Sequence, residues 1–285
     1  MIIRKVMGMY RSRGFKATAD AIFRSISSRI GIKIILFDRK KTLNLQKARN
    51  IFKNRDIKLS GKGFYYLEPM PTEAELNEYY KNAYWGSFAA ERDYGVMPRD
   101  MRHYFLLIKL FPDFNKTKRN VLNFGAGHGG ISIILRFLGH KIVNVEPSEM
   151  IEIFSTDYSK VNTISDVPHI DFDLIYGSHS LEHVQDLGSF YEKIMNISKA
   201  STIHFWEVPN AEYRFCGVNE GHVDIPHTYY FKEQFFYELF DETIFIKKYD
   251  GPTQSLNAPY ADINEKDGDC IIAIGRINKT HVGSV

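Results

Sequence analysis

The chain has 285 residues, of which 44% are hydrophobic and 14% aromatic. This apolar content is enough for a full core in one large domain, or in one domain with an appendage, and it excludes an intrinsically disordered protein. No run approaches the roughly 18 consecutive apolar residues of a membrane span, and the N-terminus lacks the pattern of a secretory signal. The two cysteines are too few for a disulfide framework. We therefore expect a cytoplasmic protein.

The net charge of +3 conceals a basic N-terminal region. Residues 1–62 hold 17 of the 37 basic residues and only 3 of the 34 acidic ones. In this region Ile22, Ile26 and Ile30 recur at helical spacing, which is typical of a basic amphipathic helix. Such a helical arm could contact an anionic membrane surface or a phosphorylated substrate, or it could pack on the acidic remainder of the chain. Basic residues alone carry no base-reading chemistry, so we expect no nucleic-acid partner.

Residues 63–118 are predicted to form a helical, aromatic-rich segment next to the substrate. Thr72 followed by Glu75 has the spacing of a capping box, so a helix should start there. The apolar residues of that helix recur about one turn apart: Leu76, Tyr79 and Tyr80. Their face can bury against the body of the protein or act as a lid, since tyrosines offer a stacking surface and a hydroxyl. A second helix within residues 98–117 should end at Pro112.

From residue 119 onward the pattern alternates between strands and helices. We expect a strand at "NVLNF", a helix at "GISIILRFLG" and a second strand at "KIVNVE", which together make a β-α-β unit. The later segments "FDLIYGS", "LGSFYEKIMNIS" and "STIHFWEVP" repeat strand, helix and strand. This alternation predicts an α/β fold with a parallel sheet covered on both faces, and ligands then bind at the carboxyl ends of the strands.

The turn after the first of these strands is rich in glycine. Gly125, Gly127 and Gly130 follow a G-x-G-x-x-G rhythm, which lets a ligand approach the backbone and the amino end of the helix. Glu146 ends the next strand, where a carboxylate can accept hydrogen bonds from both hydroxyls of a ribose. Together they predict a cofactor that contains a nucleoside. The spacing alone does not separate NAD from S-adenosylmethionine.

In their order, these motifs resemble those of class I S-adenosylmethionine-dependent methyltransferases. The resemblance rests on "VLNFGAGHGG", "HKIVNVEPS", "FDLIYGSHSLEHVQDL" and "WEVPN". It implies S-adenosylmethionine as the cofactor and a Rossmann-like, seven-stranded, mostly parallel sheet of order 3-2-1-4-5-7-6 with helices on both faces. The segments "ETIFIKKYD" and "CIIAIGRIN" would be the last two strands, and the final one would be antiparallel. Residues 119–285 would then be the methyltransferase core, preceded by a mainly helical N-terminal extension.

The same resemblance implies which residues contact the cofactor. They lie in the glycine turn, after the second strand and after the fourth: Asn123, Gly125, Ala126, Gly127, Glu146, Pro147, Ser178 and His179. Asn123 departs from the family, which usually has an acid at this position. A contact from Asn123 would therefore be neutral rather than charge-assisted.

Histidines are the candidate bases, because transfer to a hydroxyl requires removal of a proton and histidine titrates near neutral pH. His179, Glu182 and His183 have the spacing i, i+3 and i+4, so they would share one face of a helix beside the reactive end of the cofactor. In similar methyltransferases a histidine ahead of a helix that starts with Phe lines the substrate side, which makes His227 a base or an orienting residue. The predicted catalytic residues are thus His227, His183 and His179.

The same three residues of the "HSLEH" segment have two other interpretations. Ubiquinone-type O-methyltransferases, which the chain resembles, have Glu in place of His179 and use this face for a metal. We predict no metal, and a site of His179, Glu182 and His183 is the weaker alternative. In a purely structural role, Glu182 and His183 would tie their helix to the strand around Glu207.

The segment "EPMPTEAELNEYYKNAYW" resembles the region ahead of this fold in bacterial methyltransferases that act on sugars. The sequence shows neither the cysteine-ligated zinc module of some of them nor the long C-terminal domain of the sugar C-methyltransferases, so transfer to oxygen or nitrogen is favoured. We expect O-methylation of a sugar of a bacterial surface glycan, or of its nucleotide- or lipid-linked precursor, in polysaccharide biosynthesis. The alternatives are a small-molecule N-methyltransferase and a catalytically silent cofactor-binding scaffold.

Overall fold

The computed structural model describes residues 55–79, 96–127, 129–147, 159–213, 227–249 and 268–277. Most of the predicted basic arm lies outside the described residues, as does Tyr80. None of the helices in the described part of the chain is long and apolar enough to cross a lipid bilayer.

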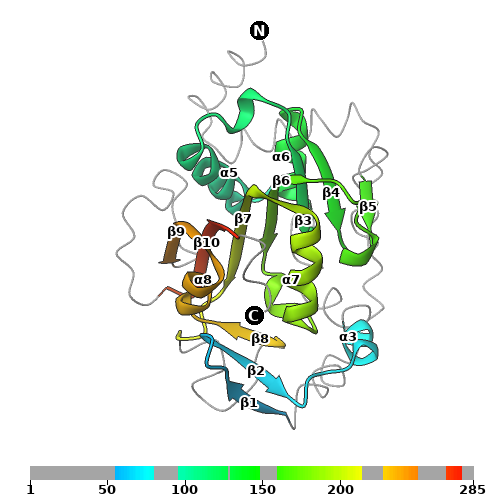
Figure 1. Ribbon diagram of the computed structural model, residues 1–285, viewed down its shortest axis with the longest axis vertical. Coiled ribbons are helices and arrows are strands. Elements are labelled where there is room, and N and C mark those ends of the chain that lie inside the picture. Colours follow the sequence, from blue (N-terminus) through cyan, green and yellow to red (C-terminus); the bar gives the residue numbers. More distant parts are fainter. Residues whose placement is uncertain are drawn as a thin grey trace.

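A seven-stranded sheet forms the centre of the molecule (Figure 1). Its strands in chain order are β3 (Asn120–Phe124), β4 (Lys141–Val145), β5 (Ser159–Val161), β6 (Phe172–Ser178), β7 (Ser198–Pro209), β9 (Glu242–Tyr249) and β10 (Cys270–Arg276). In space their order is β5-β4-β3-β6-β7-β10-β9, and only β10 runs antiparallel to its neighbours. Counted from β3 this is the order 3-2-1-4-5-7-6, so the predicted α/β, Rossmann-like fold is confirmed.

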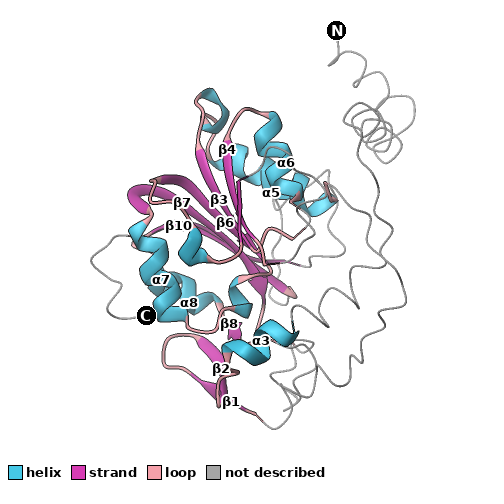
Figure 2. Cartoon of the chain, turned by 90° about the vertical axis from the view of Figure 1, so that its right-hand side faces the viewer, coloured by secondary structure: helices cyan, strands magenta, loops and turns pink. Residues whose placement is uncertain are grey.

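Helices cover both faces of this sheet (Figure 2). One face carries α5 (Pro98–Leu110) and α6 (Gly130–Phe137), and the other carries α7 (Leu187–Asn196) and α8 (Glu233–Leu239). Neighbouring residues of β3 point to opposite faces of the sheet. Val121 packs in the apolar cluster that includes α5 and α6, and Leu122 packs in the cluster that includes α7 and α8. Because both faces are buried, the parallel strands have near-continuous apolar sequences.

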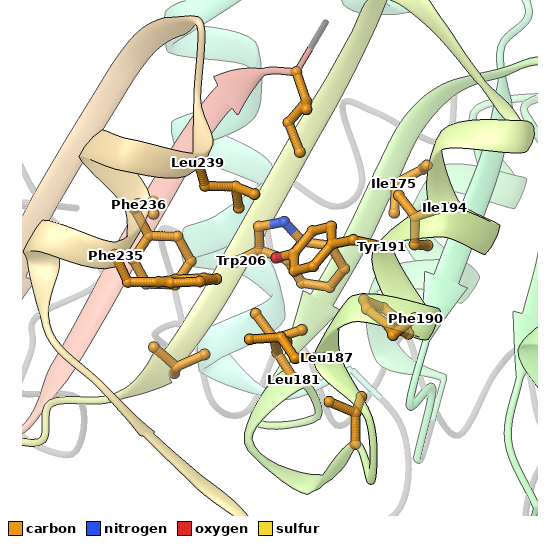
Figure 3. Packing of buried hydrophobic residues seen from close by; sticks show 14 of the residues in the cluster. Ile175, Leu181, Leu187, Phe190, Tyr191, Ile194, Trp206, Phe235, Phe236 and Leu239 are labelled. Atoms are coloured by element: carbon orange, nitrogen blue, oxygen red, sulfur yellow. The ribbon is translucent and has the colours of Figure 1, made fainter. Parts of the chain in front are cut away.

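The larger apolar cluster is organised around Trp206 (Figure 3). This fully buried side chain of β7 packs edge-on against Phe190 and Tyr191 of α7, with ring centroids 5.9 and 6.4 Å apart. Tyr191 in turn lies 6.3 Å from Phe235 of α8. Aromatic contacts of this kind add to the free energy gained by apolar burial, so they fix both helices to the sheet.

A second, smaller sheet corrects the expectation for the region before residue 70. The residues predicted as helical arm and helical segment form β1 (Asp56–Leu59) and β2 (Phe64–Glu68), which pair antiparallel with each other. The third strand is β8 (Tyr229–Phe231), paired with β2 (Figure 1). The predicted boundary between residues 62 and 63 thus falls inside a hairpin. A partner strand so far along the chain leaves no signal in the local sequence.

The helix predicted to start at Thr72 is present as α3 (Glu73–Tyr79). The Thr72 amide donates to Glu75 Oε2 at 2.7 Å, and the Glu75 amide donates back to Thr72 Oγ1 at 3.3 Å. Leu76 and Tyr79 are both buried. The capping box and the apolar face are therefore confirmed.

Candidate active site

The turn between β3 and α6 brings bare backbone to the carboxyl edge of the sheet. Gly125, Gly127 and Gly129 have φ angles of 65°, 53° and 69°, in the left-handed region that favours glycine. A Cβ at Gly125 would lie 2.3 Å from the Cβ of Ser180, whereas a Cβ at Gly129 would meet none of the described residues within 4 Å. Gly125 is thus needed for a close approach of two loops, and Gly129 borders open space.

Glu146 lies next to this turn, directly after β4. Its side chain is buried, and its Oε2 accepts a hydrogen bond of 2.8 Å from the Gly127 amide. A carboxylate beside left-handed glycines and the amino end of α6 fits an adenosine, whose ribose hydroxyls are hydrogen-bond donors. Gly125, Gly127 and Glu146 lie together at this edge, with Pro147 exposed beside them, and their contact with a cofactor stays a prediction.

Asn123 does not have the position that was predicted for it. Its side chain is 2% exposed and donates to Ser132 Oγ at 2.8 Å, and that hydroxyl donates to Asn144 Oδ1 at 2.6 Å. Asn123 and Asn144 face each other across β3 and β4. Because the Asn123 side chain is buried and its amide is bonded to Ser132, the geometry contradicts a cofactor contact from this side chain. Sequence analysis missed the partner residues Ser132 and Asn144.

The segment after β6 is not the helix that the i, i+3, i+4 spacing predicted. His179 has a φ of 51°, and only a single 3₁₀ turn, Leu181–His183, follows. The carbonyl of Glu182 accepts from both the amide and the hydroxyl of Thr228, at 2.9 and 2.8 Å. These bonds compete with helix continuation, and a left-handed residue cannot lie inside an α-helix. The turn Leu181–His183 contacts β7, as the structural interpretation predicted, and is also bonded to Thr228 just before β8.

Glu207 is the buried charge at the carboxyl end of β7. Ser178 Oγ donates to its Oε2, and Arg99 Nε and His179 Nε2 each lie 3.7 Å from that oxygen. His103 Nε2 lies 3.4 Å from Oε1. Burial favours the protonated form of Glu207, but His103, His179 and Arg99 outweigh it and hold its pKa well below the usual range. The site therefore contains a permanent anion surrounded by cationic and polar groups.

His179 is the most accessible of the three predicted catalytic histidines, with 30% of its side chain exposed. Its amide donates to the Glu207 carbonyl at 2.9 Å, and its Nδ1 lies 3.5 Å from Glu182 Oε1. Burial lowers the pKa of His179, but the carboxylates of Glu207 and Glu182 more than reverse this and raise it above its usual value. A left-handed, non-glycine residue costs about 1–2 kcal/mol and often marks a functional position.

His227 and His183 are placed differently. Burial lowers the pKa of His227 to about 3, and its side chain is almost fully buried. The His183 ring packs at 4.9 Å on that of His227, and burial lowers its pKa as well. A group that remains neutral and is closed to solvent makes a poor proton acceptor, so the geometry argues against His227 as the base.

The structure does not bring the three residues of the alternative metal site into one group. Among the described residues, two groups of three bring ligand atoms within 4.8 Å of one another: His179, Glu207 and Cys270, and Glu182, His183 and His227. Each could hold a metal ion, but the predicted set of His179, Glu182 and His183 is split between them. Sequence analysis missed Arg99, His103 and Cys270, because α5 and β10 reach this edge only in the folded protein.

Comparisons with known proteins agree with this geometry. A family model described as "Methyltransferase domain" matches residues 97–243, which is more than half of the chain. No curated protein matches. One similar structure is that of 1,6-didemethyltoxoflavin-N1-methyltransferase from Burkholderia thailandensis, which has 1,6-didemethyltoxoflavin and S-adenosylhomocysteine bound. The TM-score is 0.51 and the sequence identity 12%, and the match covers 78% of this chain and 99% of that chain. An S-adenosylmethionine-dependent methyltransferase from Clostridium acetobutylicum has a TM-score of 0.46 and 12% identity over 68% of this chain and 96% of that chain.

At 12% identity the Burkholderia structure, with a TM-score of 0.51, supports the fold alone, and the family model establishes the family. The chain therefore belongs to the methyltransferase-domain family, as an S-adenosylmethionine-dependent enzyme with a Rossmann-like fold.

Proposed function

We propose that this enzyme methylates a sugar hydroxyl of a bacterial surface glycan, or of its nucleotide- or lipid-linked precursor, with His179 as the base. The observation that carries the proposal is the accessible imidazole of His179 between two buried carboxylates. A hydroxyl must lose its proton during transfer, whereas a neutral amine can react before it does. A base of this kind therefore favours an oxygen acceptor.

S-adenosylmethionine, when bound, supplies a methyl group that is already activated by its sulfonium. The residues that would hold it are those of the glycine turn and Glu146. The protein must then align the acceptor, exclude water and take up one proton. In the transfer, the acceptor oxygen would bond to the methyl carbon as the bond from that carbon to the sulfonium sulfur breaks and leaves a neutral thioether. The proton of the acceptor hydroxyl would go to Nε2 of His179, because Nδ1 is the nitrogen nearer to Glu182. Glu182 and Glu207 stabilise the imidazolium that results.

The small sheet supports a carbohydrate acceptor. Tyr65 and Tyr66 of β2 are partly exposed, and Lys232 Nζ lies 5.1 Å from the centre of the Tyr65 ring. Thr228, just before β8, joins this sheet to Glu182 beside the candidate base. Aromatic rings of this kind offer stacking surfaces to sugars. The basic residues of 1–62 suit a phosphorylated acceptor or a peripheral membrane contact, and we expect no nucleic-acid partner.

Two other functions predict different behaviour. A small-molecule N-methyltransferase would keep its activity without a base at position 179. The sequence feature that would favour a catalytically silent scaffold is Asn123, which stands where the family usually has an acid. That side chain is explained by its hydrogen bond to Ser132 below the glycine turn. Its amide therefore gives no reason to expect loss of turnover.

The test is transfer of a labelled methyl group. The protein is incubated with methyl-labelled S-adenosylmethionine and, separately, with nucleotide sugars, lipid-linked glycans and small amines. We expect label on a sugar as an ether that resists mild base. Label on amines alone would support N-methylation, and cofactor binding by calorimetry without transfer to any acceptor would support the scaffold.

A further inference from the structure

A chain of buried polar groups leads from α5 into the active site. His103 of α5 is 1% exposed, and its Nδ1 lies 2.7 Å from the Tyr176 hydroxyl on β6. On the other side of the ring, Nε2 lies 3.4 Å from Glu207 Oε1. The imidazole therefore bridges a tyrosine under the sheet edge and the carboxylate that faces His179.

The chemistry of Tyr176 sets the direction of this bridge. Burial raises the pKa of Tyr176 well above its ordinary value, so its hydroxyl keeps its proton. We assign that hydroxyl as the donor to Nδ1, and the other ring nitrogen, Nε2, then faces Glu207 Oε1. A partner that fixes the tautomer and orientation of a histidine in this way is a recurring feature of functional sites.

Glu207 has different neighbours at its two oxygens. Oε2 faces Ser178, Arg99 and His179, whereas Oε1 faces His103. Without the His103 ring 3.4 Å from Oε1, the carboxylate could rotate and change its position relative to His179. A displacement of this kind affects the chemical step more than the binding of either substrate.

We propose that His103 is a positioning residue for methyl transfer: held by Tyr176, it fixes the Glu207 carboxylate that orients His179. The inference rests on the proposed role of His179 as the base. It assigns a function to a residue that lies outside the glycine turn and the segment after β6.

The experiment uses replacements that separate the two ring nitrogens. His103→Gln keeps an amide donor near the place of Nε2, His103→Asn keeps one only near Nδ1, and His103→Leu removes both. For the Asn and Leu variants we expect kcat to fall about tenfold or more, because a small misplacement of a group that orients the base has effects on this scale. The Gln variant should retain most of the activity, and KM for both substrates should stay unchanged in all three.

Tyr191 provides a matched control for Tyr176. Both tyrosines are buried, but the Tyr191 hydroxyl has no hydrogen-bond partner among the described residues. Tyr176→Phe should lower kcat several-fold, and Tyr191→Phe should not. The proposal is overturned if the Gln variant loses as much activity as the Leu variant, if KM rises in step with the loss of kcat, or if His103→Leu is equally harmful in a Glu207→Gln background.

A readout without acceptor separates this proposal from the proposed function. In histidine-labelled protein, the NMR signal of His179 is assigned by its loss in His179→Asn. It should shift in His103→Leu and much less in His103→Gln. If the signal shifts but no sugar is methylated, the positioning role stands and the proposed acceptor is wrong. An unmoved signal overturns the positioning role.

Discussion

The two halves of the carboxyl edge of the sheet work in opposite ways. Around β3 and β4 the site is made mainly of backbone, with Gly125 and Gly127 in left-handed conformations beside one carboxylate. Around β6, β7 and β10 it is made of side chains, with Glu207 at the centre of a charged network. A glycine-to-alanine substitution should disturb the first half, because it adds a Cβ to the backbone. Replacement of one charged side chain should disturb the second half. Binding and chemistry are therefore expected to respond separately to mutation.

The largest effect is expected at His179. His179→Asn removes the imidazole, and asparagine tolerates the left-handed conformation better than most residues do. Loss of a general base should lower kcat by about 100- to 10,000-fold. Calorimetry should show unchanged affinity for S-adenosylmethionine. Full activity in this variant would contradict the base and favour an amine acceptor.

The glycine turn should give the next largest effect. Gly125→Ala would place a Cβ 2.3 Å from the Cβ of Ser180, at a φ that is itself unfavourable. Strain and overpacking of this kind should weaken S-adenosylmethionine binding by about 10- to 100-fold. Gly129→Ala is the control, since Gly129 has a similar φ but the added Cβ would meet no atom within 4 Å in the part of the chain that the structure describes. Equal losses in both variants would show that backbone strain alone decides the affinity.

The charge of Glu207 should also set the pH dependence. Its carboxylate raises the pKa of His179, as does Glu182, while Arg99 lowers it. Cys270 Sγ, 3.9 Å from Nε2, is held protonated because burial raises its pKa. The base must be neutral, so activity falls as pH drops through this pKa. In Glu207→Gln the acid limb of kcat/KM should move to lower pH by about one unit. A limb that stays in place would exclude His179 as the titrating base.

His204 is a buried titratable group without the charged partners that keep Glu207 ionised, so the two residues can be compared. It lies on the same strand, and neither of its ring nitrogens has a hydrogen-bond partner in the described part of the chain. Burial lowers the pKa of His204 to about 3. Between the ordinary histidine pKa and this value, His204 is protonated in the unfolded chain but neutral in the folded protein. The free energy of unfolding therefore decreases as the pH is lowered through this range.

His204→Leu should remove this dependence. Relative to the parent protein, it should gain about 1 kcal/mol of unfolding free energy for each pH unit below 6. Denaturant unfolding at several pH values provides the measurement, with exposed His169→Gln as the control. Parallel pH profiles for His204→Leu and the parent would contradict the assignment.

The glycine rhythm and the strand-terminal acid could be predicted because they are local. Each depends on residues a few positions apart, and the β-α-β pattern then fixes which end of the sheet they occupy. The charged network could not be predicted in the same way. Arg99 and His103 belong to α5, and they meet Glu207 only because that helix packs across β6 and β7. The spacing of His179, Glu182 and His183 was misleading because bonds from Thr228 end the turn.

The sequence by itself thus determined the sheet, its helices on both faces and the backbone half of the site. Hydrophobic periodicity, capping and glycine conformations are short-range properties that the chain carries from residue to residue. Tertiary structure alone decided the small sheet of β1, β2 and β8 and which histidine is accessible. Strand pairing and pKa values depend on groups that are brought together from distant positions, and burial and charge act through space rather than along the chain.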